Sequence, residues 1–141
     1  MKIFLSHKKT PDDSYKWASH LNVFNGIALD SEAKEILCDD FISAFSYDDL
    51  GPLIQKICAK IRLKGQLVIK EADINITTRK YYVEEVSLEE LNNILFGDEQ
   101  KRKSVLDLNS ISKAIPDSFE IEEKYFDNST GSIVIKCRRI R

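Results

Sequence analysis

The sequence predicts an α/β domain with a mostly parallel sheet that ends in an antiparallel hairpin. An apolar strand, an amphipathic helix and a second apolar strand follow one another within residues 33–73. This order is typical of a β-α-β crossover between parallel strands. Near the C-terminus, two segments of alternating polarity flank the turn-rich run DNSTG at residues 127–131. That arrangement predicts the hairpin.

The first 34 residues predict one clear strand, the apolar run Ile3–Leu5. Residues 10–17 are polar and turn-like. Residues 20–29 form a weak second strand, interrupted by Asn25-Gly26, a pair suited to a tight turn. Two full strand–helix units plus a third strand need more residues than this. We therefore expect helices on one sheet face to be missing or reduced, which favours a homodimer over that bare face.

The central segment contains the strongest helix signal. Residues 33–38 and 66–73 predict strands, and Leu67–Ile69 is consecutively apolar, as in a strand covered on both faces. Gly65 is expected to end the intervening helix because glycine tolerates a positive φ. The apolar stripe of that helix consists of Leu50, Leu53, Ile54, Ile57, Cys58 and Ile61.

Residues 87–97 predict a further helix. It begins with a capping box formed by Ser87 and Glu90, and Gly97 is its stop signal. Residues 98–103 then read as a solvated, charged connection.

Residues 106–116 predict another short helix. Asp107 or Asn109 would cap its start, and Pro116 would stop it. The two strands of the terminal hairpin follow at residues 119–126 and 132–137.

Composition sets limits on function. The 141 residues are expected to form one domain, residues 1–141, with 43% hydrophobic and 31% charged residues. A net charge of −2 gives no electrostatic reason to bind nucleic acid or an anionic membrane, and the apolar runs are too short to span a membrane. Cys38, Cys58 and Cys137 are widely spaced. This pattern predicts a reduced, cytoplasmic protein in which they are small core residues.

Residues 35–74 resemble the class I S-adenosylmethionine-dependent methyltransferases. The likeness is to a subgroup in which a strand and loop precede a helix, a turn of the type LKPGG and another strand. Glu35-Ile36 match the first strand, Leu63–Gly65 match the turn, and Asp73-Ile74 match the exit of the second strand. A looser likeness continues to about residue 138.

The resemblance implies a Rossmann-like, three-layer architecture, here with a reduced N-terminal half. It also implies a transferase that moves a methyl group from S-adenosylmethionine to an oxygen or nitrogen nucleophile. The methyl acceptor, a small molecule or a macromolecule, is not indicated by the sequence.

The sequence departs from the family where the family binds its cofactor. The family's glycine-rich loop follows the first strand, whereas residues 6–10 read SHKKT and carry a Cβ at every position. The acid that ends the family's second strand falls near Phe24, and Asp30 replaces it only in a different register. Both histidines of the subgroup's loop are absent from residues 39–44. These departures favour an alternative: a non-catalytic pseudoenzyme that acts as a binding or assembly module.

The candidate site lies at the carboxyl ends of the predicted parallel strands, the ligand side of such a sheet. His7, Asp39 and Asp40 are candidate catalytic residues, because carboxylates there can orient a nucleophile or act as a base. The competing interpretations are helix capping by the aspartates and a solvated histidine. The candidate cofactor contacts are Ser6, Lys8, Asp30 and Asp73. Glu71 shares this rim, Lys9 stands at its mouth, and no metal site is indicated.

Two further segments have alternative interpretations. Residues 79–82 form a basic–aromatic cluster that could stack on bases or sugars, or pack on the core as a lid. Residues 136–141 alternate basic and apolar side chains, which is typical of a solvated edge strand. The sequence contains no P-loop and no Ser–His–Asp constellation.

Overall fold

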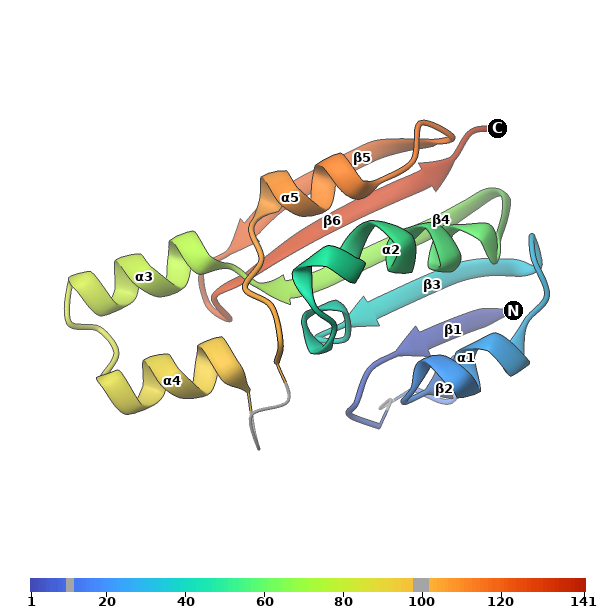
Figure 1. Ribbon diagram of the computed structural model, residues 1–141. Helices are drawn as coiled ribbons and strands as arrows, with labels where there is room; N and C mark the ends of the chain where they lie inside the picture. The colour runs from blue at the N-terminus through green and yellow to red at the C-terminus, as the bar shows by residue number, and fades with distance from the viewer. Residues whose placement is uncertain (10–11, 98–101) are drawn as a thin grey trace.

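The computed structural model describes residues 1–9, 12–97 and 102–141. Within them it forms a six-stranded sheet in the order β2-β1-β3-β4-β6-β5 (Figure 1). The β1, β2, β3 and β4 strands pair in parallel, and β6 runs antiparallel to both of its neighbours. This confirms the α/β fold class with its terminal hairpin. The strands are β1 (Lys2–Leu5), β2 (Lys16–Ala18), β3 (Ala33–Asp39), β4 (Ile61–Ala72), β5 (Phe119–Asp127) and β6 (Ser132–Arg139).

The second strand was predicted in the wrong place. The segment 21–27 is a helix, α1 (Leu21–Ile27), in which Phe24 packs into the core and Gly26 lies inside the helix. Its apolar residues Leu21, Phe24 and Ile27 are three residues apart, which suits a helix rather than a strand. The strand β2 lies earlier, at Lys16–Ala18, and overlaps the end of the segment 10–17 that was predicted to be turn-like.

The central helix is confirmed, but it ends earlier than predicted. After two short 3-10 turns, η1 (Ile42–Ala44) and η2 (Tyr47–Asp49), the helix α2 spans Leu50–Ala59 and buries its apolar stripe. The strand β4 begins at Ile61, so Gly65 lies inside a strand. A Cβ on Gly65 would lie 2.6 Å from Ile61 Cγ2, which explains why this position needs a glycine.

Three helices follow β4, namely α3 (Ile74–Tyr82), α4 (Leu88–Phe96) and α5 (Leu108–Ala114). The predicted capping box at the start of α4 is present, and Gly97 at its end has a φ of 74°. Asp107 caps α5, as predicted. The helix α3 was not predicted, and the basic–aromatic cluster at residues 79–82 lies in its last turn.

The helices α1, α2 and α5 all lie against one face of the sheet, whereas α3 and α4 extend beyond its end (Figure 1). The main hydrophobic core fills the space between these three helices and that face, and it includes all three cysteines. The opposite face carries no helix within the described residues. The expected third layer is therefore not formed there, which agrees with the shortened first half.

Ion pairs between neighbouring strands cover part of the open face. The Nζ atom of Lys136 lies 3.2 Å from Oε2 of Glu123, and the Nε atom of Arg138 lies 3.1 Å from Oε1 of Glu122. Val134, although on the open face, is only 3% exposed. The strand β6 that carries these basic residues lies inside the sheet, so its interpretation as an edge strand was wrong. The homodimer over this face stays a prediction. Among the described helices, none has the length and apolar character that a membrane span requires.

Candidate functional site

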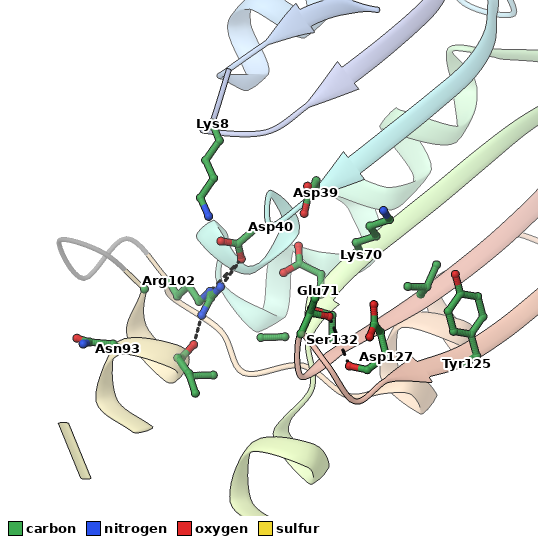
Figure 2. Close-up of a pocket in the computed structure, with 15 residues that line it drawn as sticks. Lys8, Asp39, Asp40, Lys70, Glu71, Asn93, Arg102, Tyr125, Asp127 and Ser132 are labelled. Carbon is green, nitrogen blue, oxygen red and sulfur yellow. Dashed lines mark hydrogen bonds and ion pairs between the residues drawn. The ribbon is translucent and has the colours of Figure 1, made fainter. Parts of the chain in front are cut away.

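A pocket of about 510 Å³ lies at the carboxyl ends of β3 and β4, between α4 and the β5–β6 hairpin (Figure 2). Open α/β sheets bind ligands at this end of their parallel strands. We call it the Glu71 pocket. Its charged lining residues are Lys8, Asp39, Asp40, Lys70, Glu71, Arg102 and Asp127, and Asn93, Tyr125, Thr130 and Ser132 supply further polar groups.

Asp40 leaves the end of β3 in a left-handed conformation with a φ of 53°. Its Oδ1 atom accepts hydrogen bonds from Nη2 of Arg102 at 2.6 Å and from Nε at 3.0 Å. The same guanidinium donates to the carbonyl oxygen of Ile94, near the end of α4. Arg102 therefore joins the β3 rim to the helix α4. Sequence reasoning missed this residue because it belongs to a charged run, and nothing in such a run indicates a partner 62 positions away.

Asp39 is the last residue of β3 and is partly buried. Burial raises the pKa of its carboxyl, the nearby charges of Lys70 and Lys8 lower it, and the charge of Asp40 raises it. A carboxylate with a raised pKa at the carboxyl end of a parallel strand is suited to accepting a proton or holding a cation.

Glu71 lies near the end of β4 and is only 2% exposed. Its Oε1 atom accepts hydrogen bonds from the backbone N–H groups of Ile42 at 2.7 Å and Ser43 at 3.3 Å. Asp39 or Asp40 was expected to cap the start of this segment. The residue that accepts the N–H groups at the start of the η1 turn is Glu71 instead. The Oε2 atom is buried and accepts no hydrogen bond within the described chain.

The environment of Glu71 also changes its acidity. Burial, followed by the charge of Asp40, raises the pKa of Glu71 to about 7, against the lowering effect of the hydrogen bonds from Ser43 and Ile42. A carboxyl group with a pKa near 7 changes its charge within the physiological range.

Two of the candidate cofactor residues lie away from this pocket. Asp73 is fully buried and caps α3 by accepting a hydrogen bond from the Ile76 N–H at 2.8 Å. Asp30 precedes β3 at the opposite end of the sheet, where it lies 3.4 Å from the ammonium of Lys60. The structure therefore does not bring Asp30 together with the other candidate residues.

The loop after β1 is packed against its neighbours. The Ser6 hydroxyl accepts a hydrogen bond from the Lys8 N–H at 3.1 Å, and the Ser6 carbonyl accepts one from the Trp17 indole at 2.9 Å. The His7 ring stacks on Phe41 with centroids 5.4 Å apart, and it lies 6.0 Å from the ring of His20. His7 is thus a packed residue rather than a solvated one. Thr10, the last residue of the SHKKT loop, falls outside the described residues.

The resemblance implies a cofactor beside the β1 loop and the end of β2. The cavity beside Ser6 and His7 measures about 100 Å³ and adjoins the Glu71 pocket, with which it shares Lys8, Asp40, Gly97 and Arg102. In the described chain, β2 ends at Ala18 and is followed by Ser19 and His20, so no carboxylate there can accept ribose hydroxyls. The described residues around β1 and β2 therefore do not provide the features that the family uses. They also contain no group of three or more acidic, cysteine or histidine residues placed to hold a metal.

Comparison of the sequence with protein-family models and with curated proteins found no match. Solved structures with a similar fold include an S-adenosylmethionine-dependent methyltransferase from Methanosarcina mazei, with a TM-score of 0.57, 16% identity, and coverage of 89% of this chain and 66% of that one. A Burkholderia thailandensis 1,6-didemethyltoxoflavin-N1-methyltransferase with bound S-adenosylhomocysteine has a TM-score of 0.58 and 9% identity. The match covers 97% of this chain and 60% of that one.

A third similar structure is the Synechocystis magnesium protoporphyrin IX methyltransferase with bound S-adenosylhomocysteine. Its TM-score is 0.52 at 13% identity, and the match covers 79% of this chain and 47% of that one. This chain thus spans about half to two thirds of the length of these enzymes. At these identities the likeness is one of fold. The chain therefore has the Rossmann-like fold of the class I S-adenosylmethionine-dependent methyltransferases.

Proposed function

We propose that this chain is a non-catalytic relative of the methyltransferases, a pseudoenzyme that binds a small polar molecule in the Glu71 pocket. The observation that carries the proposal is the packing of His7 on Phe41, beside His20. His7, His20 and Phe41 come from the segments after β1, after β2 and after β3, and their rings pack together where a cofactor would lie.

Cofactor binding at this position would require several changes at once. A nucleoside inserted between the β1 loop and the end of β3 would have to displace the His7 ring from Phe41. Close approach to the backbone would meet a Cβ at each position and the Ser6 carbonyl, which already accepts the Trp17 N–H. Each of these groups would lose an existing contact, which lowers the net affinity.

The Glu71 pocket supports a binding role rather than a purely structural one. Its volume of about 510 Å³ lies in the range of small-molecule sites. A buried carboxyl oxygen without a partner costs about 1–3 kcal/mol, and Glu71 Oε2 is such an atom. A ligand donor that satisfies it would recover part of this cost.

The second candidate function is methyl transfer to an oxygen or nitrogen nucleophile. It is favoured by the position of Asp39, a carboxylate with a raised pKa at the carboxyl end of β3. Asp39 would then orient the nucleophile and take its proton, while S-adenosylmethionine, when bound, would supply the methyl group. Asp40 is less suited to this role because Arg102 binds its Oδ1 atom.

Thermal unfolding in the presence of S-adenosylmethionine and S-adenosylhomocysteine distinguishes the two functions. A ligand present at 100 times its dissociation constant stabilises a protein by about 2.7 kcal/mol. The pseudoenzyme proposal predicts an unchanged midpoint up to several millimolar of either compound. A concentration-dependent rise in the wild-type midpoint would favour the methyltransferase. The His7→Ala variant is the informative partner, because a rise in this variant alone would identify the ring as the group that closes the crevice.

A further inference from the structure

We propose that the Glu71 pocket binds the ammonium group of a small primary amine, with Glu71 and Asp39 as the groups that contact it. This inference rests on the proposed function and adds the chemical class of the ligand. It starts from an atom without a partner: Glu71 Oε2 is buried and accepts no hydrogen bond from the described residues.

The hydrogen bonds of Glu71 leave one side of its carboxyl group available. The Ile42 and Ser43 N–H groups fix Oε1 and thereby set the orientation of the side chain. Figure 2 shows the carboxyl group of Glu71 turned toward Asp39 and Asp40 across the rim of the pocket. The acceptor is therefore held in place before any ligand arrives, which lowers the entropic cost of binding.

The charges around Glu71 favour a cation. Burial is the main cause that raises the pKa of Glu71 and Asp39, and the charge of Asp40 raises both further, because ionised carboxylates repel one another. Arg102 already compensates Asp40. Asp39 has only the nearby charges of Lys70 and Lys8, and Glu71 forms no ion pair within the described residues. An ammonium group has one positive charge and three N–H donors, so it can satisfy both carboxylates at once. A hydroxyl group has only one donor and no charge.

Other cations fit the pocket less well. The described carboxylates do not form a cluster of three that could hold a metal ion. When Glu71 is ionised, the four acidic residues Asp39, Asp40, Glu71 and Asp127 face three basic ones, Lys8, Lys70 and Arg102, so the lining carries about one net negative charge. That balance suits a small monoamine better than a polyamine or a basic macromolecule.

The test uses ethanolamine as the probe, with ethylene glycol as the neutral analogue and glycolate as the anionic one. Each is titrated into the full chain, labelled with ¹⁵N, at pH 8, where Glu71 is largely ionised. The reporters are the amide resonances of Ile42 and Ser43, because these N–H groups donate to Glu71. We expect ethanolamine to shift both resonances with saturation, at a midpoint at least tenfold lower than that of either analogue.

Two variants locate the effect. Glu71→Gln keeps an oxygen for the Ile42 N–H but removes the charge, and it should weaken the ethanolamine response at least tenfold. Glu120→Gln is the matched control, because Glu120 is an exposed carboxylate on β5 that does not line the pocket, and it should leave the midpoint within about twofold. The proposal is wrong if ethanolamine gives no saturable shift, if glycolate or ethylene glycol acts equally well, or if Glu71→Gln responds like wild type.

These outcomes are separate from the test of the proposed function. Failure of ethanolamine, with no stabilisation by S-adenosylhomocysteine, removes the amine class and leaves the pseudoenzyme proposal standing. Stabilisation by S-adenosylhomocysteine removes the pseudoenzyme proposal whatever ethanolamine does.

Discussion

The two sides of the sheet, taken along the strand order β2-β1-β3-β4-β6-β5, differ in strand length. On the β2 side, which we call the short end, β2 has three residues and β1 has four. At the other end, β4 has twelve residues and pairs continuously with β6, which in turn pairs with β5. The resemblance to the methyltransferases lies in the well-built end, while the short end contains the loops where that family binds its cofactor. The sequence departs from that family mainly in the loops of this short end.

The Glu71 pocket lies between these two regions. Its acidic rim comes from β3 and β4, the strands at the centre of the sheet, and the hairpin supplies the opposite wall. A site built on long, paired strands is held more rigidly than one built on loops. The proposed binding site therefore lies in the part of the sheet that has the longer strands.

The largest effect is expected in the core of the longer strands. Ile135 on β6 is fully buried, so Ile135→Ala should lower the free energy of unfolding by about 2–5 kcal/mol, measured by urea denaturation. Ile3→Ala on β1 should cost less, because the short β1–β2 end can relax around the cavity. An equal or greater cost for Ile3→Ala would contradict the difference between the two ends. Lys124→Ala, on the exposed side of β5, is the surface control.

A second effect concerns the pH dependence of stability. The pKa of Glu71 rises from 4.5 to about 7 on folding, so the folded state keeps a proton that the unfolded state releases. Stability should therefore fall as pH rises from about 4.5 to about 7, by roughly 3 kcal/mol from this group. The measurement is the difference in unfolding free energy between wild type and Glu71→Gln at several pH values. A difference that does not change over this window would show that Glu71 titrates normally.

The junction between the rim and α4 gives a smaller effect. Arg102→Ala removes two charge-assisted hydrogen bonds to Asp40 and should lower the unfolding free energy by about 1–2 kcal/mol. A double-mutant cycle with Asp40→Ala isolates the interaction between the two side chains. A coupling energy close to zero would mean that Arg102 does not join α4 to the sheet in solution.

The smallest effects compare glycines in the two regions. Gly26 in α1 and Gly51 in α2 have open space where a Cβ would be added, so alanine at either position should stabilise its helix by about 0.5–1 kcal/mol. If α1 opens locally, Gly26→Ala should slow amide exchange in α1 and raise global stability less than Gly51→Ala. The same gain in global stability from both would show that α1 unfolds together with the rest of the domain.

The sequence predicted the strongly periodic elements well, but it missed the helix α3 and misplaced the short elements β2 and α1. The stripe from Leu50 to Cys58 and the alternation of the terminal hairpin repeat often enough to identify a helix and two strands. By contrast, the three residues of β2 are too few to show any period, and α1 comprises about two turns. In such short segments, tertiary packing decides the conformation.

The candidate site was predicted in part for the same reason. The positions of Asp39, Asp40 and Glu71 on one rim follow from parallel strands, and the structure brings them together. The partner of Asp40 could not be inferred, because the Arg102 contact depends on how the chain returns from α4. The Glu71 hydrogen bonds to the η1 turn likewise depend on tertiary structure.

The most direct test of the central claim is a calorimetric titration of the wild-type chain with S-adenosylhomocysteine at 25 °C. If His7 and Phe41 close the crevice that the family uses for its cofactor, the titration should give no saturable heat up to several millimolar. A saturable heat with a dissociation constant in the micromolar range would contradict this account and identify the chain as a cofactor-binding methyltransferase.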